Sequence, residues 1–173
     1  MTNVKAKTLN LQFLRLAQVG FLMALVFLAS RQVTAQTDTF QVTADISASC
    51  TVVATDLAFG TYDVFSATPT DGTATMDVTC TNATTYDVGL DEGTGTGATV
   101  ASRKMTSGAN LLNYSLYQES GRTTVWGDTA GVDTVSGTGS GSAQTITAYG
   151  RIFALQSSAP GSYADTITVT VTF

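Results

Sequence analysis

The last eleven residues, Tyr163–Phe173, carry the most regular pattern in the sequence. Apolar side chains at Ile167, Val169, Val171 and Phe173 alternate with the threonines between them, which is the period of a half-buried β-strand. The sequence as given supplies no later segment, so we expect the far edge of this strand to be unpaired. A long apolar edge is a liability in a monomer and an asset in a subunit that polymerises by strand addition.

The opposite end of the chain has the pattern of a secretory signal peptide. Basic residues precede the apolar run 19–29, and Val33-Thr34-Ala35 supplies small residues at the positions that a signal peptidase reads. Eleven apolar residues are too few to span a bilayer core of about 30 Å, which disfavours a membrane anchor. We therefore predict a signal peptide over residues 1–35 and an exported chain of 138 residues, enough for one domain.

Charge excludes two classes of partner for the exported chain. The predicted leader carries four of the eight basic residues and none of the thirteen acidic ones. The exported part keeps four basic and thirteen acidic residues, a formal charge of −9. Such a surface repels nucleic acid and anionic lipid.

The composition of the exported part predicts an all-β fold. Threonine, valine and glycine are frequent, no helical stripe is present, and turn residues separate short alternating segments, as in an antiparallel sandwich or barrel. About seven strands are expected, over residues 40–48, 74–80, 85–90, 111–118, 123–127, 143–155 and 163–173. Residues 68–72 are expected to form a turn, and residues 91–102 and 128–142 to form loops.

Two cysteines, Cys50 and Cys80, lie in the exported part. In an oxidising compartment such a pair predicts one disulfide, worth roughly 3–4 kcal/mol by loop entropy. A zinc site needs more ligands than this pair supplies, and a redox pair is normally much closer in sequence.

Little in the sequence predicts catalysis, and we expect no catalytic residue, no metal and no cofactor. The chain contains no histidine, which removes the imidazole base of the common nucleophilic triads. Asp87, Asp91 and Glu92 could be imagined as paired carboxylates or calcium ligands, but solvated loop acids are the more common case. The glycines of 93–97 lack the lysine of a phosphate-binding loop.

Aromatic residues offer a second, weaker binding hypothesis. Trp126 and the tyrosines Tyr62, Tyr114, Tyr117, Tyr149 and Tyr163 could form a carbohydrate platform. Aromatic residues spaced along strands more often pack in the core or across strands, which is the preferred interpretation.

The segment Thr37–Ala48 presents alternating apolar side chains directly after the predicted cleavage point. It could pair within its own domain and complete an ordinary sandwich. Alternatively it could leave that domain and fill an open groove in the next subunit, where backbone hydrogen bonds give affinity and side chains set the register. Head-to-tail insertion of this kind does not close on itself and generates a fibre.

The mature chain resembles secreted proteins with the spore coat protein U domain, a family that includes the pilin subunits of archaic chaperone–usher pili. The resemblance covers essentially the whole mature chain and depends on the order of several short motifs. They are Ala44-Asp-Ile-Ser-Ala-Ser-Cys50-Thr-Val, Leu57-Ala-Phe-Gly60-Thr-Tyr62, Val78-Thr-Cys80, Tyr114-Ser-Leu-Tyr117, Tyr149-Gly-Arg151-Ile, and Gly161-Ser-Tyr163 through to Phe173.

The resemblance implies an immunoglobulin-like antiparallel β-sandwich that lacks its last strand. Its implied partners are a periplasmic pilus chaperone, an outer-membrane usher and copies of itself or related pilins. The implied donor residues are Phe40, Val42, Ala44 and Ile46 in a donor strand over 36–48. The implied acceptor and chaperone-binding edge is Ile167, Val169, Val171 and Phe173 in a domain over 49–173, with Cys50–Cys80 as the disulfide.

One feature departs from the family pattern, because the extension before Cys50 is short and leaves little room for a separate first strand. The function expected from this resemblance is a structural subunit of a surface pilus, exported through the periplasm, that supports adhesion or biofilm formation. The alternatives are a self-contained spore coat or extracellular matrix protein and a carbohydrate-binding adhesin module. An enzyme is the least favoured reading.

Overall fold

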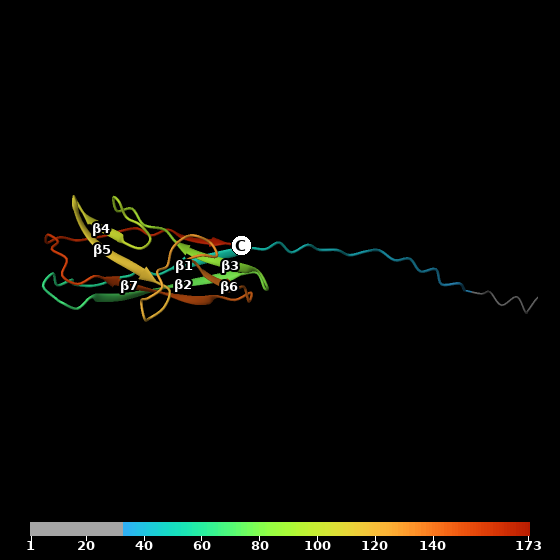
Figure 1. The fold of residues 1–173 in the computed structure, drawn as a ribbon. Helices are drawn as coiled ribbons and strands as arrows, with labels where there is room; N and C mark the ends of the chain where they lie inside the picture. The colour runs from blue at the N-terminus through green and yellow to red at the C-terminus, as the bar shows by residue number, and fades with distance from the viewer. Residues whose placement is uncertain (1–32) are drawn as a thin grey trace, which may run out of the picture. The chain divides into compact units, whose positions relative to one another are not determined.

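The computed structural model describes residues 33–173 and contains eight strands in two antiparallel sheets (Figure 1). The strands are β1 Cys50–Ala54, β2 Thr70–Cys80, β3 Thr85–Leu90, β4 Arg103–Ser107, β5 Asn110–Tyr117, β6 Val135–Thr138, β7 Gln144–Ile152 and β8 Val169–Thr172. The described residues form no helix, which agrees with the all-β prediction. Across 33–173, therefore, no helix is long and apolar enough to cross a membrane.

The large sheet has the order β1-β2-β7-β5-β4. Its inner face follows directly from the period-two pattern of the sequence, because alternate residues of a strand point to the same face. Met76, Val78 and Cys80 of β2 are buried, as are Ala148 and Ile152 of β7, while the residues between them are more exposed. The small sheet, with the order β6-β3-β8, covers this face with Tyr86, Val88 and Leu90 of β3.

Four strand assignments from the sequence were incomplete or wrong. The sequence predicted a loop that included residues 128–142, yet β6 lies there, and β4 was not expected at all. Residues 123–127 form no strand and pair with β5 only through the isolated bridge between Tyr117 and Val125. β2 already begins at Thr70, inside the predicted turn 68–72, since its pairing with β7 extends to Ile152.

Two buried polar side chains tie the sheets together beside β4. Arg103 is fully buried, and its guanidinium donates to the carbonyl oxygens of Leu90, Asp91, Val100 and Trp126 at 2.7–2.8 Å. Trp126 is also fully buried, and its indole donates to the carbonyl of Val88 at 2.8 Å. The hypothesis that Trp126 belongs to an exposed carbohydrate platform is therefore wrong.

The disulfide joins Cys50 and Cys80, which face each other in the β1–β2 register. It stands at one end of the sandwich, where Ser49 and Thr81 also exchange hydrogen bonds through Ser49 N, Ser49 O and Thr81 N. We call this the disulfide end.

The residues before the disulfide form no strand, from Val33 to Ser49. The chain divides into two compact units at Ala44–Asp45, and the sandwich belongs to the second unit, Asp45–Phe173. The predicted signal peptide ends at Ala35, so apart from its last three residues it lies outside the described residues.

Candidate functional site

The small sheet stops at β8 among the described residues, but the layer it belongs to continues beyond a gap. The segment 55–62, which follows β1, lies on the inner face of the large sheet. Leu57 and Phe59 contact the backbone of Gly72 and Gly150 so closely that a Cβ on either glycine would be within 3.2 Å of both side chains. Residues 54–59, which include the start of this segment, therefore form the far wall of that gap.

Two aromatic residues fix this segment over the large sheet. The rings of Phe59 and Tyr114 meet edge to face, with their centroids 6.0 Å apart. The Tyr62 hydroxyl donates to the carbonyl of Phe153 and accepts from the amide of Gln156, each at 2.8 Å. The wall is held by side chains rather than by a strand ladder.

Between the two walls lies an open groove of about 440 Å³, which we call the edge groove. One wall is residues 54–59 and the other is residues 163–169. Its floor is apolar and comes from both sheets, through Ala74, Met76, Leu90, Met105, Tyr114, Leu116 and Ala148. The groove thus exposes part of the hydrophobic core along the position that another strand of the small sheet would occupy.

The backbone of the terminal segment is oriented to accept such a strand. Thr168 directs its carbonyl to the amide of Asp91 and its amide to the Asp91 side chain, so its polar groups face β3. Backbone groups of successive strand residues point to alternate sides. Ile167 and Val169 therefore direct their amide and carbonyl groups away from β3, toward the edge groove that their side chains line.

The groove widens at the end away from the disulfide into a mouth of about 1170 Å³. The mouth lies between residues 57–65 and residues 157–163, and Leu112, Ile152 and Leu155 also line it. At the other end the groove is narrow, because β1 and β8 approach each other there.

Asp165 fixes the wall formed by residues 163–169. Its carboxylate accepts from the amide and hydroxyl of Thr94 and from the amide of Thr166, all at 2.8 Å. It also accepts from the Tyr114 hydroxyl at 2.8 Å, and burial together with this bond raises the pKa of Tyr114 far above its usual range. Ala164 pairs with Thr106 of β4, which holds the same wall from the other side.

Two of the four predicted acceptor residues lie on this wall. Ile167 and Val169 line the edge groove, while Val171 is half-buried against the core nearer the disulfide end and Phe173 is 58% exposed. The regular strand β8 covers only Val169–Thr172 and is shorter than the predicted strand 163–173.

The predicted donor residues carry exposed side chains. Phe40, Val42 and Ile46 are 88%, 82% and 88% exposed, and Ala44 is exposed as well. Sequence reasoning did not identify the wall 54–59. The sequence signal was the alternation of Leu57 and Phe59, followed by glycines at Gly72 and Gly150, which leave space for large side chains.

The polar groups that the sequence singled out form structural contacts instead. Asp87 accepts from Thr134 and Ser136, and Asp91 accepts from the amides of Gly93 and Thr168. Within 33–173, no three acidic, cysteine or histidine side chains are grouped to hold a metal ion.

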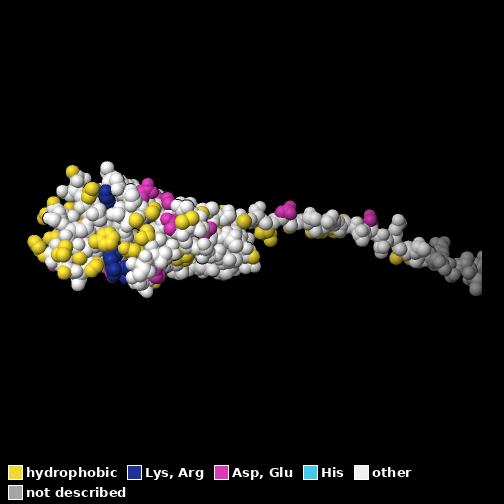
Figure 2. All heavy atoms as spheres, in the orientation of Figure 1, with side chains coloured by type: hydrophobic (Ala, Val, Ile, Leu, Met, Phe, Trp, Pro, Cys, Tyr) yellow, Lys and Arg dark blue, Asp and Glu magenta, His cyan; other side chains and the backbone are white. Residues whose placement is uncertain are grey.

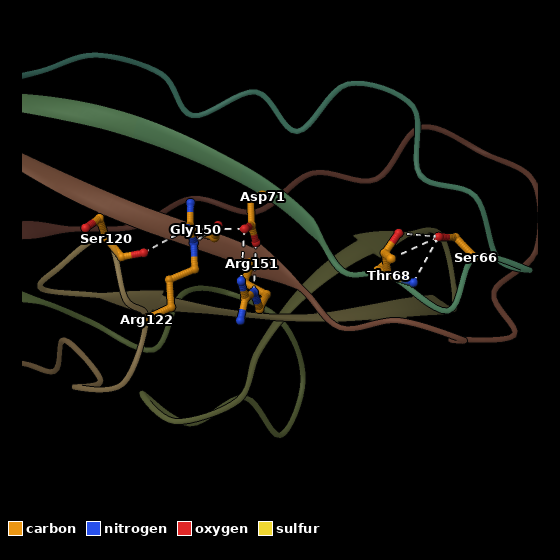
Figure 3. Close-up of polar contacts among 7 residues, drawn as sticks. All are labelled: Ser66, Thr68, Asp71, Ser120, Arg122, Gly150 and Arg151. Atoms are coloured by element: carbon orange, nitrogen blue, oxygen red, sulfur yellow. Dashed lines mark hydrogen bonds and ion pairs between the residues drawn. The ribbon is translucent and has the colours of Figure 1, made fainter.

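Among residues 33–173, an ionic cluster lies on the outer face of β2 and β7 (Figure 3). Asp71 accepts two hydrogen bonds from Arg151, at 2.8 and 2.9 Å, and lies 3.3 Å from Arg122. The hydrogen bonds from Arg151 lower the pKa of the Asp71 carboxyl. Arg122 also donates to the carbonyls of Gly150 and Ser120. These groups therefore bind one another and the neighbouring backbone.

Comparison with known proteins shows the family. A family model described as the Spore Coat Protein U domain matches residues 36–170. Protein U of Myxococcus xanthus is 35% identical over 128 residues, which cover 68% of this chain and 71% of that protein.

One solved structure that shares the fold is a chain from the crystal structure of the CsuC–CsuE chaperone–tip adhesion subunit pre-assembly complex of archaic chaperone–usher Csu pili from Acinetobacter baumannii. The similarity has a TM-score of 0.54 at 23% identity and covers 74% of this chain but only 40% of that one. The Hda pilus minor tip subunit HdaB of E. coli matches with a TM-score of 0.36 at 21% identity, covering 71% of this chain and 79% of that one. The sandwich is immunoglobulin-like.

Proposed function

This chain belongs to the spore coat protein U family, and from that premise we propose that it is a secreted subunit of a surface fibre assembled by donor-strand complementation. The observation that carries the proposal is the edge groove, an apolar slot in the place of a missing strand, walled by residues 54–59 and 163–169. A strand inserted there would extend the small sheet beyond β8 and cover the exposed part of the core.

The N-terminal segment has the chemistry of the inserted strand. Val42, Ala44 and Ile46 recur at every second position, the spacing that places side chains on one face of a strand. All three side chains are exposed. Burial of each larger side chain is worth roughly 1.5–3 kcal/mol, so several in one groove would give a very stable junction.

The same groove determines which partners the subunit would need before and during assembly. Before assembly an apolar groove of this kind requires a temporary occupant, and a periplasmic chaperone that lends a strand would supply it. An outer-membrane usher would then exchange that strand for the N-terminal segment of another subunit. The mature protein would act at the cell surface, where a fibre would support adhesion or biofilm formation.

The test is to express the full-length chain with its chaperone and to follow fibre formation by electron microscopy. Val42→Asp and Ile46→Asp would place a charge in the apolar groove and are expected to abolish fibres while the subunit remains soluble with the chaperone. Thr43→Asp is the matched control, because it adds the same charge at the alternate position of the strand. Normal fibres from both Val42→Asp and Ile46→Asp would contradict the proposal.

The second candidate is a self-contained coat or matrix protein, which the match to protein U and the family name favour. In such a protein, a segment of the same chain would pair with the edge of β8 that does not face β3. Size-exclusion chromatography separates the two functions: a stable monomer that needs no chaperone and whose residues 36–48 resist protease would favour the coat protein.

A further inference from the structure

We propose that consecutive subunits also make a direct contact between their folded domains, in which the groove mouth of one copy receives the disulfide end of the next. This inference is based on the proposed function and concerns a surface that strand insertion alone does not use. We call the acceptor side the mouth patch, defined as Val64, Phe65, Leu155, Ala159 and Pro160, all of which line the mouth.

The mouth patch is apolar, exposed and ordered. Phe65 is 87% exposed and Leu155 is 63% exposed, and Figure 2 shows hydrophobic side chains gathered at the end of the sandwich that holds β4 and β5. The amide of Phe65 is bound by the Asp63 side chain, and Ser66 is bonded to both the amide and hydroxyl of Thr68 (Figure 3). Leu155 donates its amide to the carbonyl of Ser66, which joins the two loops.

The backbone conformation of Leu155 also favours a role in contact with another subunit. Its φ is +57°, in the left-handed region that β-carbon sterics disfavour for leucine. An exposed leucine in that conformation contributes little to folding. Backbone strain of this kind is kept where another function needs the side chain.

The geometry of the groove places the next domain at the mouth. The groove narrows where β1 meets β8 and is open at the mouth, so an inserted segment would leave through the mouth toward its own domain. Only three residues separate Ile46 from Cys50, and Ser49 is already bonded to Thr81 of its own sandwich. Four residue steps of an extended chain span about 13 Å, so the disulfide end of the donor must lie against the mouth.

Charge also fits this contact. In a chain with thirteen acidic residues, two copies would repel each other at most faces. Asp63 is the one charged side chain among the described residues that line the mouth. Near the disulfide end, Asp77 pairs in register with Val53 and Asp87 with Thr172, and the hydroxyls of Thr145 and Ser136 donate to these two carboxylates. A mouth lined by a single charged side chain repels an approaching acidic domain less than the more acidic faces would, so a second copy of this chain can be the partner.

The experiment compares strand insertion with fibre stability in the same variants. The full-length chain is produced with its chaperone, and two readouts are taken: binding of a synthetic peptide of residues 36–48 to the subunit, and resistance of assembled fibres to guanidinium. The test variants are Phe65→Ser and Leu155→Asn, alone and combined. Val132→Ser is the control, because Val132 is similarly exposed but lies outside the mouth.

We expect the peptide dissociation constant to change by less than about twofold, as for exposed substitutions in general. Fibres of the double variant should dissociate at lower guanidinium, and electron cryomicroscopy should show a less uniform angle between subunits. Leu155→Asn should leave the thermal stability of the peptide-bound subunit unchanged or raised, since asparagine tolerates a positive φ.

Two outcomes would overturn the inference alone. In the first, fibres of the double variant keep their resistance to guanidinium and the uniform angle between their subunits. In the second, those fibres are likewise unchanged but no longer attach to an apolar solid surface, which would make the mouth patch an adhesive site. Failure of the peptide to bind the wild-type subunit would overturn the proposed function as well.

Discussion

At the scale of single residues, Glu119 shows how one carboxylate shapes a turn at the sandwich surface. It accepts from the amides of Thr123 and Thr124 at 2.7 and 2.8 Å and from the Thr123 hydroxyl at 2.6 Å. These hydrogen bonds favour the charged form and lower the pKa of Glu119 from its ordinary value of 4.5 to about 2. The turn therefore gains stability from the ionised carboxylate, and Arg122 in this turn takes a positive φ.

The pH dependence of this contribution has a definite sign. A group whose pKa is lower in the folded state stabilises that state above its unfolded pKa, and the effect is lost as the pH falls through the folded pKa. Wild type should therefore exceed Glu119→Gln in thermal midpoint at pH 7, and the difference should shrink between about pH 4.5 and about pH 2. Thermal unfolding of the peptide-bound subunit measures this. Glu92→Gln removes the same charge from another exposed loop, and an equal pH-dependent difference there would refute the assignment to the turn.

At the scale of elements, the groove wall 54–59 depends on two glycines opposite it, Gly72 and Gly150. A Cβ on Gly150 would lie 2.8 Å from both Leu57 and Phe59, so those side chains would have to move. Gly150→Ala should therefore cost about 1–3 kcal/mol in free energy of unfolding, as overpacking does, and should weaken binding of the 36–48 peptide by shifting one groove wall.

Denaturant unfolding and peptide titration test that expectation together. Gly121→Ala is the control, because the nearest atom to its added Cβ is 4.0 Å away. If Gly150→Ala bound the peptide with wild-type affinity, the wall 54–59 would not be part of the binding groove.

At the scale of the whole molecule, the disulfide secures the edge from which the N-terminal segment departs. β1 pairs only with β2 among the described strands, and Cys50–Cys80 links the two. Replacing both cysteines with serine should destabilise the peptide-bound subunit by roughly 3–4 kcal/mol, from the entropy of a loop that spans a sequence separation of 30. For a domain of this size that corresponds to a fall in thermal midpoint of about 10 °C or more.

Differential scanning calorimetry gives the size of this effect. Reduction of the wild-type protein is the matched comparison, because it opens the same loop without a substitution. A midpoint unchanged in both would show that β1 does not depend on the link.

The sequence predicted the features that arise from short-range pattern. Alternation identified the inner faces of β2, β7 and the terminal segment, because a strand exposes alternate residues whatever surrounds it. It failed for β4 and β6, whose segments are short and rich in polar residues or glycine and become strands only by pairing with β5 and β3. It also left Trp126 open to two readings, since burial depends on the carbonyl of Val88 and on the layers above it.

The candidate site divides in the same way. By itself the sequence determined an apolar alternating pattern within residues 163–173, of which β8 covers Val169–Thr172, and a cysteine pair, because both are set by residue type and spacing. Only the tertiary structure decided that residues 54–59 stand across a gap from residues 163–169, and that the gap narrows at the disulfide end and widens at the mouth. An open edge is a relation between distant segments, and it exists only once both sheets have packed on their common core.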